Sequence, residues 1–120
     1  MAFDRQTTLA SPTGATLNLY VKHASGTPRA VVQINHGLAE HAARYARFAD
    51  YLAPRGFHVY VHDHRGHGAT KAPDAPLGRF AGTDGPAKVI ADVDAVHDVI
   101  AKEQPGVPVI LFGHSMGASV

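Results

Sequence analysis

Residues 113–117 read Gly-His-Ser-Met-Gly, and this spacing is the first feature of the sequence that could do chemistry. The pattern G-x-S-x-G is typical of a sharp turn between a strand and a helix, with the serine exposed at its tip as a nucleophile. Glycine is needed at both ends because the serine backbone is strained and larger side chains would push strand and helix apart. A glycine-rich turn without chemistry is the alternative interpretation. The uncharged apolar run before the pattern favours a nucleophile, and Ser115 is the predicted catalytic residue.

That apolar run, residues 107–112, reads Val-Pro-Val-Ile-Leu-Phe and predicts a strand buried on both faces of a parallel sheet. The first two of the other predicted strands flank the turn sequence Ser-Pro-Thr-Gly and should form an antiparallel hairpin at one edge. The alternation of strands and helices that follows predicts right-handed crossovers, a parallel sheet and the α/β fold class. The other strands are predicted at 6–10, 16–23, 30–34 and 57–61, and the helices at 42–54 and 85–103.

Helical spacing gives each predicted helix one apolar face that should pack on the sheet. We expect Arg55-Gly56 to end the first helix and Asp84 to cap the second. The face of the first helix comprises Tyr45, Phe48, Ala49 and Leu52, and that of the second comprises Val89, Ile90, Val93, Val96, Val99 and Ile100.

The composition is that of an ordinary globular domain. The chain has 120 residues, 45% hydrophobic and 18% charged, which is enough for one small domain with a core. The net charge of +1, with both signs mixed, indicates neither a nucleic-acid partner nor a polybasic membrane anchor. There is no cysteine, which excludes disulfides and thiol catalysis. Because no apolar leader or spanning stretch is present, we expect a cytoplasmic protein.

Three more motifs precede the serine motif in an order that defines a family pattern. They are His-Gly-Leu-Ala-Glu-His at residues 36–41, Arg44-Tyr45, and Asp-His-Arg-Gly-His-Gly at residues 63–68. Together with residues 113–117 they resemble the α/β-hydrolase superfamily, within it the monoacylglycerol lipase and lysophospholipase branch. The resemblance runs from about residue 5 to the last residue. It implies a mostly parallel sheet with an antiparallel N-terminal hairpin and a serine esterase that acts on an acyl ester lipid.

The resemblance also implies roles for three residues. Ser115 would be the nucleophile, and the backbone N–H groups of Leu38 and Met116 would form the oxyanion hole. Two fixed donors stabilise the charge that develops on an ester carbonyl oxygen under attack. No metal and no organic cofactor is required. The sequence departs from the branch at Ala39, where glycine is frequent, and at Thr70, where serine is common.

The largest departure is length. In this superfamily the acid and the histidine of the triad follow the serine, whereas this sequence stops at Val120. We therefore expect residues 1–120 to be the N-terminal part of a single domain, truncated after the serine turn, with the cap and C-terminal part absent. The strand at 107–112 would then be an unpaired apolar edge, and the isolated chain would fold poorly and be inactive. A complementary C-terminal segment could cover that edge, and the absent cap could contact membranes.

Two other function classes stay open. His62, His64 and His67 resemble the H-x-H-x-D-H ligand pattern of a zinc hydrolase, but Gly66 stands at the aspartate position. We favour the interpretation that Asp63 and its neighbours hydrogen-bond the backbone of their own loop. A non-catalytic binding module on the same fold is the other alternative. None of the upstream histidines is expected to be the general base.

Overall fold

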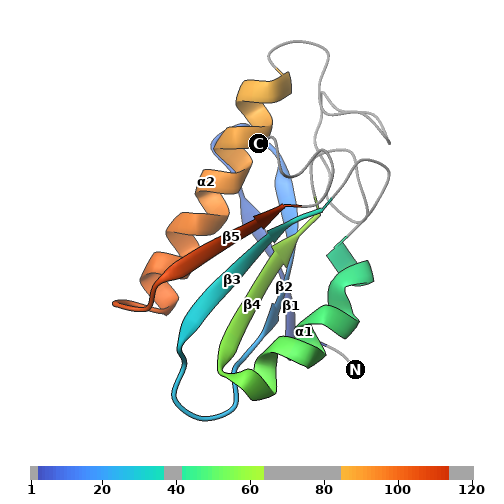
Figure 1. Cartoon of the computed structure of the whole chain (residues 1–120). Helices are drawn as coiled ribbons and strands as arrows, with labels where there is room; N and C mark the ends of the chain where they lie inside the picture. Colours follow the sequence, from blue (N-terminus) through green and yellow to red (C-terminus); the bar gives the residue numbers. More distant parts are fainter. Residues whose placement is uncertain (1–2, 37–41, 64–84, 114–120) are drawn as a thin grey trace.

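The computed structural model describes residues 3–36, 42–63 and 85–113, which form one five-stranded mixed sheet (Figure 1). The strand order is β1-β2-β4-β3-β5. β3 runs parallel to both β4 and β5, whereas the β1–β2 hairpin is antiparallel and joins β4 at one edge. The predicted α/β class and edge hairpin are confirmed. The strands are β1 (Arg5–Ala10), β2 (Thr16–Lys22), β3 (Ala30–Asn35), β4 (Phe57–His62) and β5 (Val109–Gly113).

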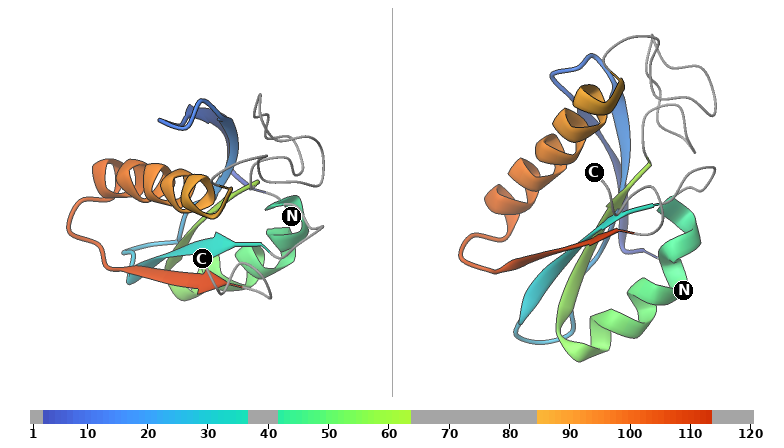
Figure 2. Two further views of the ribbon diagram at one scale, coloured as in Figure 1. Left: turned by 90° about the horizontal axis from the view of Figure 1, so that it is seen from above. Right: turned by 45° about the horizontal axis from the view of Figure 1, so that its top comes forward.

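The helices lie on opposite faces of the sheet (Figure 2, left). The predicted second helix is one helix with the predicted bounds, α2 (Gly85–Glu103). The predicted first helix is instead three short segments, η1 (Ala42–Tyr45), α1 (Ala46–Leu52) and η2 (Ala53–Arg55). Pro54 contributes to this division because it lacks the N–H that an α-helical turn needs, and the chain tightens there into a 3₁₀ turn.

Gly56 ends this helical region, as predicted. Its φ is +92°, in the left-handed region that side chains rarely adopt, and its N–H donates to the carbonyl of Ala53 at 3.1 Å. A Cβ at this position would also lie 2.9 Å from side-chain carbons of Arg29. Glycine is therefore required both by the backbone conformation and by the space.

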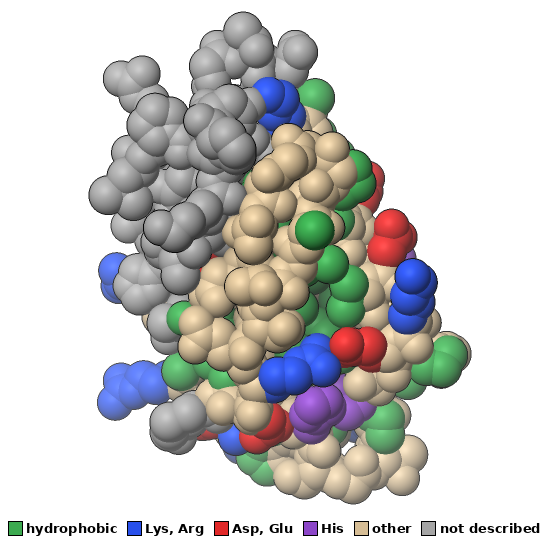
Figure 3. Space-filling model, turned by 180° about the vertical axis from the view of Figure 1, so that it is seen from behind, with side chains coloured by type: hydrophobic (Ala, Val, Ile, Leu, Met, Phe, Trp, Pro, Cys, Tyr) green, Lys and Arg blue, Asp and Glu red, His purple; other side chains and the backbone are tan. Residues whose placement is uncertain are grey.

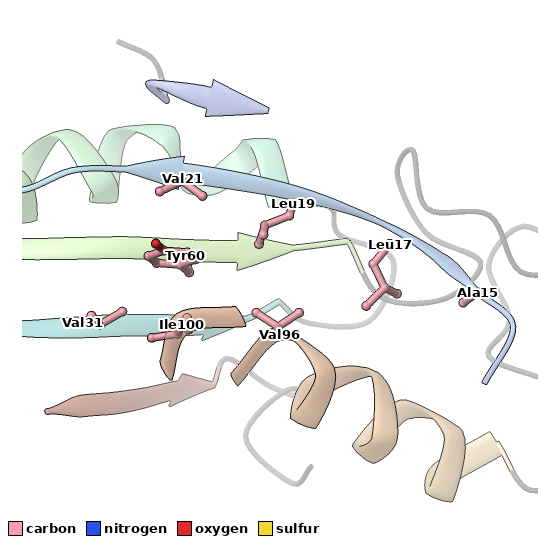
Figure 4. Packing of buried hydrophobic residues seen from close by; sticks show 8 residues of the cluster. All are labelled: Ala15, Leu17, Leu19, Val21, Val31, Tyr60, Val96 and Ile100. Carbon is pink, nitrogen blue, oxygen red and sulfur yellow. The ribbon is translucent and has the colours of Figure 1, made fainter. Parts of the chain in front are cut away.

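The larger core lies between the sheet and α2 (Figure 4). Alternate residues of β2 point into it, because successive side chains of a strand face opposite sides of the sheet. The ring of Tyr60 is buried there, while its hydroxyl donates to Glu103 Oε1 at 2.5 Å. The buried members are Ala15, Leu17, Leu19, Val21, Val31, Tyr60, Val96 and Ile100.

The second core lies between the sheet and α1, and it confirms the apolar face predicted for the first helix. Ala49 is buried, and three neighbours at helical spacing pack against this core. On α2, by contrast, the prediction for Ile90 is wrong, since 48% of this residue is exposed. The buried stripe follows Val89, Val93, Val96 and Ile100, and Ile90 is turned about 100° from Val89 around the helix.

β5 is the edge strand on the side opposite the hairpin. Ile110, Leu111 and Phe112 are 49%, 54% and 38% exposed, so the prediction of burial on both faces is wrong for this structure. Within the described residues β5 pairs with β3 alone, and no described strand pairs with its other backbone edge. The expected apolar edge is therefore present. It is a hazard for aggregation, because its backbone groups are open to another strand.

The surface carries both signs of charge. Viewed from behind, acidic and basic side chains of the described residues are interspersed rather than gathered by sign (Figure 3). One partly exposed group of charges comprises Asp4, Lys22 and Asp50, with the Lys22 Nζ 3.7 Å from Asp4 Oδ1 and 3.5 Å from Asp50 Oδ1. Among the described residues, no helix has the length and apolar character that crossing a membrane requires.

Candidate active site

The candidate site is framed by the carboxyl ends of the three parallel strands. The register pairs Asn35 of β3 with His62 of β4 and with Gly113 of β5, so these strands end level with one another. In open α/β sheets, ligands bind in the crevice outside these strand ends. The segment 37–41 follows β3 in the sequence, and the segment 114–120 follows β5.

The three predicted site residues lie in those segments. Ser115, Leu38 and Met116 are all outside the described residues, so their roles stay predictions. The structure does bring the strands that precede them side by side, because β3 and β5 are paired along their length. Other predicted residues outside the described ranges are Ala39, His41, His64, Gly66, His67, Thr70, Asp84 and His114.

Asp63, directly after β4, makes three hydrogen bonds to other described residues at these strand ends. It is 1% exposed. Its Oδ1 accepts from the backbone N–H of Ala42 at 2.6 Å, and its Oδ2 accepts from Asn18 Nδ2 at 2.8 Å. Its own N–H donates to the Asn18 carbonyl at 2.9 Å. The described bonds reach β2 and the first residue of η1, and the expected bonds to its own loop fall on residues 64–84, outside the described residues.

His62 is held neutral at the end of β4. It is fully buried, and this burial, together with the nearby His36, lowers its pKa to about 4, while Asp63 opposes the shift. A buried imidazole resists protonation because the charged form loses its hydration. The predicted zinc ligands His64 and His67 lie outside the described residues. Within the described ranges no three His, Cys, Asp or Glu side chains are grouped to hold a metal ion.

The buried amides of β3 were not anticipated as a feature of the site. Gln33 and Asn35 occupy alternate positions, and both are buried. Gln33 Nε2 donates to the carbonyl of Val93 in α2 at 3.1 Å. The amide atoms of Asn35 have no hydrogen-bond partner among the described residues. The signal in the sequence was the pair of polar residues with strand period within an otherwise apolar run.

The sheet order, the edge hairpin and the helices on both faces define this structure as an α/β hydrolase. It superposes on a thermostable carboxyl esterase from Bacillus coagulans with a TM-score of 0.84 and 30% identity, over 98% of this chain and 38% of that one. Residues 26–120 match the family described as serine aminopeptidase, S33, and the chain belongs to that family.

Several relatives of this chain bear the name of a monoglyceride lipase or of a homolog of one. The chain is 39% identical to a monoglyceride lipase homolog of Monkeypox virus over 93 residues, which are 78% of this chain and 32% of that protein. It is 36% identical to the monoglyceride lipase of Mus musculus over 96 residues, 80% of this chain and 30% of that protein. The chain therefore matches about a third of the length of these relatives.

Proposed function

We propose that the native protein, meaning the polypeptide that carries residues 1–120 in its source, hydrolyses monoacylglycerols or lysophospholipids through an acyl-enzyme on Ser115. The observation that carries this proposal is the register of β3 and β5, which end level at Asn35 and Gly113. This geometry supports a site in which the residues after β3 supply one oxyanion donor and those after β5 supply the nucleophile.

The reaction would proceed in two steps. Ser115 Oγ forms a bond to the ester carbonyl carbon as its proton moves to a histidine, and the ester C–O bond breaks as that proton passes to the leaving alcohol. Water then attacks the acyl-enzyme, which releases the fatty acid and returns a proton to Ser115. The N–H groups of Leu38 and Met116 would stabilise the oxyanion in both steps, each contributing about 3 kcal/mol to the barrier reduction.

The substrate class rests on the named relatives, two of which are a monoglyceride lipase and its viral homolog. The family description names an aminopeptidase, so amide hydrolysis is the competing reaction. A comparison of 1-monoacylglycerol, lysophosphatidylcholine and an aminoacyl anilide of matched concentration separates the three. We expect the monoacylglycerol to have the highest kcat/KM.

The acid and the histidine of the triad, in this proposal, come from outside residues 1–120, as does the cap that would meet a lipid surface. Residues 1–120 would then be part of a single cytoplasmic hydrolase domain. The exposed apolar edge of β5 supports this, since Leu111 and its neighbours have the composition of a covered strand. The isolated chain should have negligible turnover, and turnover equal to that of a complete hydrolase would contradict this.

The test is fluorophosphonate labelling of the native protein, with an intact-mass readout and a Ser115→Ala variant. We expect a labelled species of more than twice 12.7 kDa, the mass of residues 1–120. Ser115→Ala should abolish labelling and lower kcat by at least about 10⁴-fold, because the nucleophile is lost. Ser25→Ala, in an exposed loop, is the matched control and should change neither.

Each alternative gives a different result. Full esterase activity in Ser115→Ala would falsify the assignment of the nucleophile. Activity that is lost to a chelator and restored by Zn²⁺ would favour the zinc hydrolase. Saturable binding of a monoacylglycerol without labelling or turnover would favour the non-catalytic binding module.

A further inference from the structure

The Asp63 carboxylate connects three segments that are distant in the sequence. It follows β4, it accepts from the Asn18 side chain in β2, and it accepts from the N–H of Ala42, where η1 begins. The first N–H groups of a helix have no partner within that helix, so an acceptor from elsewhere fixes the position of its first turn. Here the residue that follows β4 supplies the acceptor, and its carboxylate is buried.

We propose that Asp63 is a positioning residue of the hydrolase reaction, which sets the start of η1 and thereby the backbone of the segment that carries Leu38. This inference rests on the proposed function, because it gives the segment 37–41 its role. The two described residues that flank the segment 37–41 are both fixed in position. His36 is fully buried after β3, and Ala42 is fully buried and bonded to Asp63. Leu38 lies four positions before Ala42 in the sequence.

The position favours a carboxylate because two donors of the described residues approach its two oxygens. A backbone N–H and an amide Nδ2 approach two different oxygens, at 2.6 and 2.8 Å. Asparagine has the same shape but a single oxygen, so Asp63→Asn must point its own NH₂ group at one of the two donors. One hydrogen bond is lost and two donors face each other, while the volume of the side chain is unchanged.

The chain offers a rescue that restores the pattern of donors and acceptors. Asn18 Oδ1 already accepts from Gln6 Nε2 at 3.0 Å. In the double variant Asn18→Asp, Asp63→Asn, the carboxylate at 18 accepts from Gln6 and from the new amide at 63. The remaining oxygen at 63 still accepts from Ala42. The single variant Asn18→Asp instead places two carboxylates against each other, which disrupts the same contact by repulsion.

Asp92 provides the matched control. It is also fully buried, and it accepts from Ser11 Oγ at 2.6 Å and Thr13 Oγ1 at 2.7 Å. Asp92→Asn therefore makes the same chemical change at an equally buried carboxylate, but at one that accepts from side-chain hydroxyls of the turn between β1 and β2. A loss of activity through general destabilisation should appear in both variants, whereas a positioning effect should appear at Asp63 alone.

The experiment measures kcat and KM for monoacylglycerol hydrolysis, with hydrogen exchange of peptides covering residues 36–46, in the native protein and these variants. We expect Asp63→Asn to lower kcat about 10–100-fold with KM within about twofold, because a small displacement of an oxyanion donor acts in the transition state. Exchange in residues 36–46 should rise. The double variant should recover kcat to within about threefold of the wild type, and Asp92→Asn should keep both values.

The possible failures are distinguishable. An active wild type in which Asp63→Asn keeps its kcat overturns the inference and leaves the proposed function standing. Equal losses in Asp63→Asn and Asp92→Asn also overturn it, since destabilisation then explains both. An inactive wild type overturns the proposed function and with it the positioning role of Asp63 in the reaction, while the exchange of residues 36–46 still decides whether Asp63 fixes the start of η1.

Discussion

Two buried carboxylates lie in different regions of this molecule. One is next to the candidate site at the strand ends, and the other joins α2 to the β1–β2 turn. Asp63, after β4, uses both oxygens, and one of its donors is a backbone N–H at the start of η1. Asp92, in α2, accepts on Oδ1 from the side-chain hydroxyls of Ser11 and Thr13 in the β1–β2 turn. They are 1% and 0% exposed, so burial alone does not distinguish them.

The difference lies in what the donors can do when the acceptor changes. A hydroxyl rotates about its C–O bond and can find another acceptor, whereas a backbone N–H moves only with its segment. The contact at Asp92 therefore stabilises a turn that can adapt. The contact at Asp63 defines where a segment of backbone lies, which is the property that a site built from backbone donors needs.

The largest effect on stability is expected when each carboxylate is replaced by alanine, and it should differ between the two regions. Asp63→Ala leaves the Ala42 N–H and the Asn18 amide buried without this acceptor, and we expect a loss of about 4 kcal/mol in the free energy of unfolding. Asp92→Ala should cost about 2 kcal/mol, since the two hydroxyls can reorient. Urea denaturation of the native protein measures both. Equal losses would remove the basis of the comparison.

Acid should lower the free energy of unfolding through His62, the last residue of β4. Its folded pKa is about 4, below the ordinary value of 6.5, so the unfolded chain takes up the proton first as the pH falls. The contribution of neutral His62 to the free energy of unfolding is fully present above pH 6.5. It is lost as the pH falls toward 4, by about 3 kcal/mol in total. His62→Gln should flatten the dependence of unfolding free energy on pH over this range. An unchanged slope in that variant would assign the acid sensitivity to other groups.

The smallest effects should come from the turn. Ser11→Ala removes one donor to Asp92, and we expect a loss of about 1–2 kcal/mol with kcat within twofold of the wild type. Thr13→Ser keeps the hydroxyl and should cost less than about 0.5 kcal/mol. Thermal unfolding and steady-state kinetics check both variants. A fall in kcat for Ser11→Ala would show that the turn also affects the site.

Local patterns in the sequence predicted most of the described elements. The hairpin, the parallel strands and the single helix α2 follow from apolar period and turn residues, and Gly56 ends the first helical region as expected. Ile90 was placed wrongly because period alone does not say where a buried stripe ends. Asp92 occupies a buried position on α2 instead, and its partners in the β1–β2 turn could not be read from the helix.

The sequence by itself determined the α/β class, the edge hairpin and the candidate nucleophile Ser115, because each depends on residues that are close together in the chain. Only the tertiary structure decided that Asp63 meets Asn18 and Ala42. The physical reason is that a carboxylate in a glycine-rich motif has the same local pattern whether it bonds its own loop or a distant strand. The strand order β1-β2-β4-β3-β5 brings those distant partners within hydrogen-bond distance.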